Sequence, residues 1–281
     1  MEQKTLSEFD SLRLIYQEII EGCSISKDGT IFLKHLTDID NIEVLRQRIV
    51  FLNYYLSKGI PSESTRLKEL IESSEWSLEK EDQILSLRYS ISDNEHNLRN
   101  IIPQQQASIK YGIEMDKKKL ISLLTERHLT FGTTAEEMSN RDSSNFFGFF
   151  SAYKDRKLTI PFFKNWEEFD ELDNDEHDKF QVLVNENYEK FSDKNIKGLA
   201  CLPIFLNAFS YCKEDLVSFL NKPIALLSSN QLHLFSLGER NLNILSKTKA
   251  SPPELLDDIK ISDIVSWYDL QYSVILGKRN G

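Results

Sequence analysis

The sequence predicts a mainly α-helical, multi-helical protein with a central antiparallel helical hairpin and a small N-terminal β-hairpin. Apolar side chains recur at spacings of three and four residues through most of the chain, which is the periodicity of amphipathic helices. The 281 residues include only 10 glycines and 7 prolines, fewer than an architecture of short strands and turns requires. Asp28 and Gly29 lie between the two alternating arms of Ser24–Leu36, and this pattern predicts the β-hairpin.

Composition indicates a folded chain with a substantial core. Hydrophobic residues make up 40% of the sequence and aromatic residues 11%, which is enough apolar surface for one large domain or two ordinary ones. Changes in pattern along the chain divide it into three regions. We predict an N-terminal helical region with a β-hairpin over residues 1–75, a helical hairpin over 76–132 and a C-terminal helical domain over 133–281.

The N-terminal region is predicted to contain three helices besides the β-hairpin. An apolar face between residues 5 and 21 predicts the first helix, which ends at Gly22. Asp40 is positioned to cap the second helix, which stops at Gly59. A shorter third helix opens at Ser62, directly after a proline.

The central hairpin is predicted from two heptad seams on either side of Pro103. The first arm starts at a cap on Ser77, and Asn94 fills the one polar position of its seam. The seam residues are Ile84, Leu87, Ile91, Leu98 and Ile101 in the first arm and Ile109, Ile113, Leu120 and Leu123 in the second. Pro103 is predicted to break the first helix, and the glutamines at 104 to 106 are predicted to form the bridge between the two arms. Gly112 is interpreted as a point where the two arms approach each other closely. The alternative is one long kinked helix.

A segment dense in aromatic residues follows the hairpin. Thr133 and Glu136 form a capping box that starts the helix leading into it. The candidate partner-binding residues are Phe146, Phe147, Phe149, Phe150, Tyr153, Phe162, Phe163 and Trp166. Two interpretations stay open, an ordinary core and an exposed interaction surface. Because aromatic anchors dominate binding energy at interfaces, the second interpretation makes this segment a partner site.

The rest of the chain is predicted to be helical. The helices span about residues 173–191, 203–212, 228–245 and 262–275. Pro203 is placed in a first helical turn, and Ser228 with Gln231 has the spacing of a capping box.

An acidic stretch with His177 inside it invites a metal or acid-base interpretation. Its members are Glu167, Glu168, Asp170, Glu171, Asp173, Asp175, Glu176 and Asp178. The order of residues lacks the glycine of a calcium-binding loop. Acidic residues also accumulate where a helix begins, because the helix dipole favours negative charge there. We interpret the stretch as a helix start.

Motifs for catalysis, cofactors and metals are absent from the sequence. It contains no GxSxG, GxxxxGK[ST], GxGxxG or HExxH pattern. The five histidines are scattered, at positions 35, 96, 128, 177 and 233. The three cysteines, an odd number without a CxxC pair, are interpreted as reduced thiols: Cys23, Cys201 and Cys212. We therefore expect no catalytic residue, no cofactor and no metal ion.

Charge and hydropathy disfavour two broad classes of partner, nucleic acids and membranes. The 44 acidic residues exceed the 34 basic ones, and the formal net charge of -10 repels a phosphate backbone. Phe147-Gly148-Phe149 echoes an RNA-recognition strand, but Asn145 and Phe146 stand where that motif has a basic residue and a glycine. No apolar run approaches the length of a membrane span, and no signal peptide is visible, so we expect a cytoplasmic protein without a membrane partner.

Some local patterns resemble accessory or virion and tail assembly proteins of tailed bacteriophages. The first is Arg127, Leu129, Gly132, Thr134, Ala135 and Glu136 in the order R-x-L-x-x-G-x-T-A-E. The second consists of Phe219, Lys222, Pro223, Leu227 and Gln231. The resemblance implies an assembly chaperone or a virion component that holds another protein, located in the host cytoplasm or the virion.

The sequence thus favours a non-enzymatic protein that binds another protein, through the helical hairpin, the aromatic segment or both. The heptad seams and the missing catalytic motifs motivate this hypothesis. One alternative is an enzyme or ligand-binding domain whose motif-free site lies in the C-terminal helices, near the acidic stretch and His177. The other is a nucleic-acid adaptor, which salt-sensitive retention on DNA or RNA would reveal.

Overall fold

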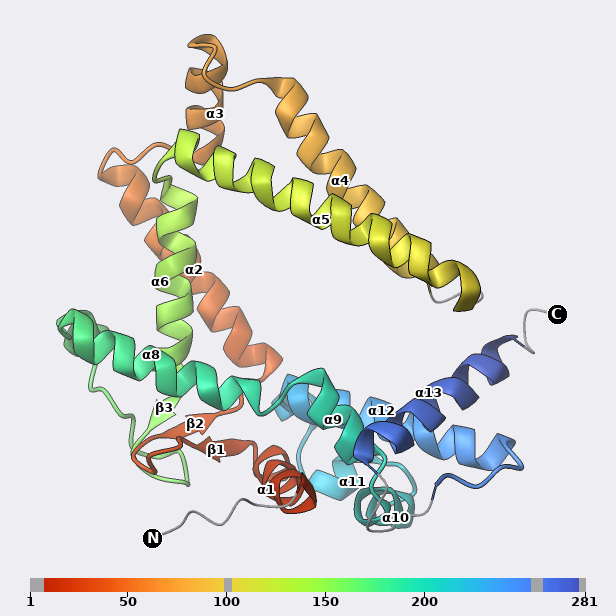
Figure 1. The fold of residues 1–281 in the computed structure, drawn as a ribbon. Helices are drawn as coiled ribbons and strands as arrows, with labels where there is room; N and C mark the ends of the chain where they lie inside the picture. Colours follow the sequence, from red (N-terminus) through yellow and green to blue (C-terminus); the bar gives the residue numbers. More distant parts are fainter. Residues whose placement is uncertain (1–7, 99–102, 254–259, 278–281) are drawn as a thin grey trace, which may run out of the picture. The chain divides into compact units, whose positions relative to one another are not determined.

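The computed structural model describes residues 8–98, 103–253 and 260–277, and these form a mainly α-helical protein with a small antiparallel sheet (Figure 1). The predicted fold class is therefore confirmed. The chain groups into two compact units, one made of residues 1–45 and 144–281 and the other of residues 46–143. Both boundaries fall inside helices, whereas the boundaries predicted from sequence fell after residues 75 and 132.

The first unit begins with the predicted helix and β-hairpin. Helix α1 (Glu8–Glu21) ends at Gly22, whose φ of 73° lies in the left-handed region that glycine tolerates. Strands β1 (Cys23–Ile25) and β2 (Phe32–Lys34) then pair in antiparallel register. Both predictions are confirmed.

A third strand, β3 (Ala152–Tyr153), was not predicted. It pairs antiparallel with the far edge of β2, so that the order in the sheet is β1-β2-β3. Tyr153 also forms a bridge with Pro161, which returns along the outer edge of β3. A strand of only two residues has no sequence pattern of its own. The strand β3 is defined by its pairing with β2, which lies far away in the sequence.

Helices form the rest of the first unit. They are α7 (Trp166–Asp170), α8 (Asn174–Glu189), α9 (Asp193–Ala200), α10 (Pro203–Tyr211), α11 (Leu216–Leu220), α12 (Ser229–Lys247) and α13 (Ile261–Gly277). The capping box of Ser228 and Gln231 is present as predicted, and Pro203 opens α10. The short helices α7, α9 and α11 were not predicted. The largest core cluster joins α1 to α9, α10, α12 and α13 around the fully buried Phe205 and Leu234.

The second unit contains the predicted helical hairpin. Its arms are α4 (Leu78–Asn97), capped by Ser77, and α5 (Pro103–Phe131). Three ion pairs cross between the antiparallel arms. Lys80–Glu126 at 2.6 Å and Glu81–Arg127 at 2.7 Å join the start of α4 to the end of α5, and Glu95–Lys117 at 2.7 Å joins the end of α4 to the middle of α5. The seam residues Ile84, Ile91 and Ile113 are buried. Ile101 lies outside the described residues.

Three details of the predicted hairpin need correction or refinement. The glutamines at 104 to 106 lie inside α5 and do not form a bridge, because Pro103 takes the first helical position, where its missing N–H costs nothing. Asn94 donates to Ser90, and Ser90 donates to Asp116 of the other arm, so the polar seam position belongs to a small network. Gly112 is exposed, and a Cβ there would meet no atom within 4 Å, so it marks no close approach.

Gly112 therefore provides a simple stability prediction. Gly112→Ala should stabilise the second unit by about 1 kcal/mol, because alanine is the better helix former and the site has room for its methyl group. Urea unfolding followed by circular dichroism measures the change. A lower midpoint for the variant would contradict the open environment that the structure gives this residue.

Three further helices complete the second unit, and two of them have different caps from those predicted. They are α2 (Asp38–Ser57), α3 (Glu63–Glu72) and α6 (Ala135–Ser151), of which α2 and α6 extend into the first unit. Ser62 caps α3 as predicted. In α2 the cap is Thr37, whose hydroxyl accepts from the Asp40 N–H, while the Asp40 carboxylate accepts from the Thr37 N–H. In α6 the cap is Thr134, one residue after the predicted Thr133.

Candidate functional site

The aromatic segment is packed inside the first unit. Of its eight predicted partner-binding residues, Phe146 and Phe163 are buried and the other six are half-buried: Phe147, Phe149, Phe150, Tyr153, Phe162 and Trp166. The ring of Phe149 lies 5.5 Å from that of Trp166 and 6.0 Å from that of Phe163. Phe169 and Phe180 complete the cluster beside the sheet. Packing alone explains the density of rings, and a partner-binding role for them stays a prediction.

The acidic stretch spans the short helix α7 and the start of α8. Glu167 and Glu168 lie in the first turn of α7, and the Asp173 carboxylate caps α8 by accepting from the Glu176 N–H at 2.8 Å. The ring of His177 lies 5.3 Å from that of Phe169. Within the described residues, no three His, Cys, Asp or Glu side chains converge as metal ligands. Helix starts therefore explain the positions of Glu167, Glu168, Asp173, Asp175 and Glu176.

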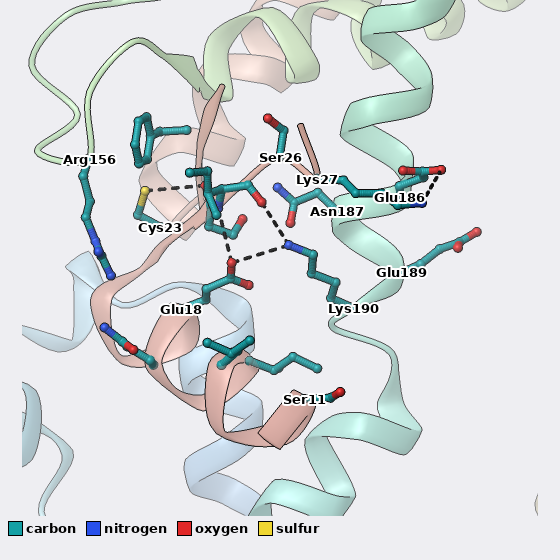
Figure 2. Close-up of a pocket in the computed structure, with 16 residues that line it drawn as sticks. Ser11, Glu18, Cys23, Ser26, Lys27, Arg156, Glu186, Asn187, Glu189 and Lys190 are labelled. Carbon is teal, nitrogen blue, oxygen red and sulfur yellow. Dashed lines mark hydrogen bonds and ion pairs between the residues drawn. The ribbon is translucent and has the colours of Figure 1, made fainter. Parts of the chain in front are cut away.

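A cavity of about 830 Å³ opens in the first unit between α1, β1 and the end of α8 (Figure 2). Its apolar wall contains Leu14, Ile15, Ile25 and Phe32. Its polar wall carries carboxylates and cations in equal number: Glu18, Glu186, Glu189, Lys27, Arg156 and Lys190. The cavity walls therefore have no net charge. A volume of this size is typical of small-molecule sites.

An ion pair inside the cavity holds the edge of the sheet. The Glu18 carboxylate accepts from the Ile25 N–H at 3.3 Å through Oε1, and the Lys190 ammonium lies 3.4 Å from the same oxygen. Lys190 also donates to the Ile25 carbonyl oxygen at 2.9 Å. Two side chains thus occupy the main-chain groups that an edge strand would otherwise present to another strand.

Two polar groups in the cavity lack a hydrogen-bond partner within the described parts of the chain. Asn187 is 2% exposed, and neither its amide nitrogen nor its amide oxygen is paired. The Oε2 atom of Glu18 is also buried and unpaired. Leaving one such group unsatisfied costs about 1–3 kcal/mol. Figure 2 shows Asn187 and Lys190 extending from α8 and the residues after it, on the side of the cavity facing Glu18.

Cys23 also lines the cavity, but its thiol is a poor nucleophile at neutral pH. Cys23 is buried at 4% exposure, and burial, assisted by nearby Glu21, raises the pKa of the thiol to about 11. The nucleophilic thiolate is therefore scarce at neutral pH. The cavity is suited to binding by hydrogen bonds and apolar contact.

Helix α2 carries a second candidate site, an exposed apolar stripe. Ile42, Leu45, Ile49, Leu52 and Leu56 follow one another at spacings of three, four, three and four residues, which places them on one helix face. The exposed fractions are 56% for Ile42, 56% for Leu45, 59% for Ile49 and 41% for Leu56, while Leu52 is half-buried. We call these five residues the α2 stripe.

A different face of α2 packs against α6 within the second unit. Phe51 is buried on that face, and the Tyr55 hydroxyl donates to the Asp142 carboxylate. The Ser139 hydroxyl of α6 donates to the Arg48 carbonyl oxygen at 2.7 Å. Packing inside the unit therefore uses one side of α2, while the stripe faces solvent.

Comparison with protein-family models, curated proteins and solved structures finds no match to this chain. No helix within the described ranges is long and apolar enough to span a bilayer. Sequence reasoning predicted the helix between Asp40 and Gly59 without indicating that one of its apolar faces is exposed. It missed the cavity entirely, because no local pattern marks Glu18, Asn187 or Lys190.

Proposed function

We propose that this protein binds another protein and that the α2 stripe is the contact surface. The supporting observation is that five apolar residues with heptad spacing lie along one face of a helix, and four of them are exposed. Exposed, contiguous apolar faces of this kind mark interaction sites in soluble proteins. The heptad spacing favours a helix as the occupant, because only a helix presents side chains with the matching period.

The charges beside the stripe favour a partner helix with acidic flanks. Arg48 is exposed and lies beside the apolar residues. A glutamate at the flanking position of a partner helix would pair with it, as such positions do in coiled coils. A second copy of α2 would instead bring another arginine to the contact. We therefore expect a different protein as the partner.

A pair of synthetic amphipathic helices tests both parts of the proposal. The two peptides share Ile and Leu at the heptad positions and differ only in having Glu or Lys at the flanks. We expect the Glu-flanked peptide to bind at least about tenfold more tightly by fluorescence anisotropy. Replacing Ile49 and Leu56 together by Glu should abolish binding, because charge replaces the apolar contact and repels the acidic peptide.

The matched control changes two exposed apolar residues on the hairpin of the second unit, which also contains Ile49 and Leu56. Tyr89 is 82% exposed and Leu129 is 77% exposed, and both become Glu. This variant should bind like the wild type. If the control variant lost binding and the α2 variant kept it, the contact surface would be the hairpin and not the α2 stripe. Equal affinity for both peptides, or a dimer in light scattering that Ile49→Glu dissociates, would contradict the proposed partner.

A role in phage virion or tail assembly, suggested by the resemblance of the sequence patterns, stays a prediction. If the protein serves such an assembly, the partner should be a virion component with an acidic amphipathic helix. The proposed contact does not depend on that biological setting, because it rests on the α2 stripe alone.

A further inference from the structure

We propose that the cavity between α1, β1 and α8 binds a small, uncharged, amphipathic molecule whose polar head is a carboxamide. This site lies wholly in the first unit and shares no residue with the α2 stripe. Three properties of the cavity carry the inference: the unpaired polar groups, the balance of charge and the apolar wall.

Asn187 and Glu18 define the polar head. The Asn187 side chain is 2% exposed, and both its donor and its acceptor are unpaired within the described residues. Glu18 adds one buried, unpaired acceptor, Oε2. A carboxamide accepts through its oxygen and donates two hydrogens through its nitrogen, so its donors and acceptor match the Asn187 NH₂ group, the Asn187 oxygen and Glu18 Oε2.

Charged heads fit the same groups poorly. A carboxylate has no donor for the Asn187 oxygen and would be repelled by Glu18. An ammonium has no acceptor for the Asn187 nitrogen and would approach the Lys190 ammonium, which already lies 3.4 Å from Glu18. The walls carry three carboxylates and three cations, so they attract neither sign over the other. The charges thus favour an uncharged ligand.

The apolar wall defines the remainder of the ligand. Leu14 and Ile25 are exposed at 52% and 39%, and Ile15 and Phe32 lie beside them in the cavity lining. A branched aliphatic group would cover these side chains while the head group reaches Asn187. A volume of about 830 Å³ accommodates a ligand of this kind with room for a larger tail.

Three probes with the same branched tail test the head group: isovaleramide, isovalerate and isoamylamine. Each is titrated into the ¹⁵N-labelled full chain, and the side-chain amide signals of Asn187 and the backbone amide of Ile25 are followed. We expect saturable shifts with isovaleramide and at least about tenfold weaker binding of the charged probes. Equal binding of all three, or no saturable shift of the Asn187 signals with isovaleramide, would overturn the proposal and leave the cavity to water or unspecific apolar contact.

Asn187→Leu keeps the approximate size of the side chain and removes both hydrogen bonds. It should weaken isovaleramide binding at least about tenfold while the melting temperature stays equal or rises, because an unpaired buried amide is lost. Asn243→Leu, at an exposed asparagine on α12, is the matched control and should bind like the wild type. Leu14→Glu, at a half-exposed position of the wall, provides a second variant should Asn187→Leu fail to fold. Unchanged binding in either cavity variant would overturn the assignment.

Discussion

Lowering the pH from about 6.5 to about 4 should destabilise the first unit by about 3 kcal/mol, and His35 should account for most of that loss. His35 is 4% exposed, and both ring nitrogens are unpaired within the described residues. Its ring lies edge-on to that of Phe191 at 4.4 Å. Burial, with a smaller contribution from the Lys190 cation, lowers the pKa of His35 from 6.5 to about 4.

The sign of the effect follows from which state takes up the proton. The unfolded chain protonates His35 near pH 6.5, while the folded chain keeps the imidazole neutral down to about pH 4. Between these values the unfolded state binds more protons, so the free energy of unfolding decreases as the pH falls. The contribution of His35 to the free energy of unfolding is complete above the unfolded-state pKa of 6.5. It decreases no further below the folded-state pKa of about 4.

Urea unfolding at a series of pH values measures this dependence. His35→Leu should flatten the curve in the window between the two pKa values, because leucine cannot take up a proton. A wild-type curve that is already flat across the window would show that His35 is solvated or paired in solution.

Gly238→Ala should destabilise the first unit by about 1–3 kcal/mol, although alanine is the better helix former. A Cβ at this position would lie 2.7 Å from Cε1 and 2.9 Å from Cζ of Phe205. Phe205 is fully buried and stacks on Phe209 at 5.7 Å between ring centres, so its ring has little freedom to move aside. Overpacking therefore outweighs the usual gain in helix propensity of about 1 kcal/mol.

The comparison with Gly112→Ala makes this prediction specific. Both substitutions add one methyl group to a glycine inside a helix, and the expected changes in stability have opposite signs. Urea or thermal unfolding of the two variants beside the wild type gives both values. A stabilised Gly238→Ala variant would mean that α10 and α12 lie farther apart than the structure places them.

Local signals in the sequence predicted many ends of elements correctly. Gly22 ends α1 because it adopts a positive φ, and Ser228 with Gln231 starts α12 through a reciprocal pair of hydrogen bonds. Pro103 starts α5 for an equally local reason, although the connection between the arms was predicted at the three glutamines that follow it. These rules involve residues only a few positions apart, so no knowledge of the tertiary structure is needed to apply them.

Features that depend on tertiary contact could not be predicted from the sequence. Strand β3 exists through pairing of Ala152 with Leu33, and nothing in its own sequence indicates a partner. The cavity brings Glu18 beside Asn187 and Lys190, which are separated by most of the first unit in sequence. Whether a polar group is paired after folding is decided only when these segments meet.

Periodicity predicted apolar helix faces without distinguishing covered faces from exposed ones. The same spacing of three and four residues appears in the hairpin, where Ile84 and Ile91 are buried, and in α2, where Ile42 and Ile49 are exposed. In the hairpin, each arm covers the apolar face of the other. The corresponding face of α2 is exposed. The aromatic segment gave the opposite result, since rings that suggested an interface pack largely against one another.

The small sheet bears on how the protein behaves at high concentration. Glu18 and Lys190 occupy the outer main-chain groups of Ile25 at one edge, and Pro161, which has no N–H, lies beside Tyr153 at the other. A strand from a neighbouring molecule would therefore find these edge positions already taken or unable to donate. We expect the sheet to be a poor template for amyloid-like growth or strand swapping, so that concentrated and refolding samples stay clear of fibrils.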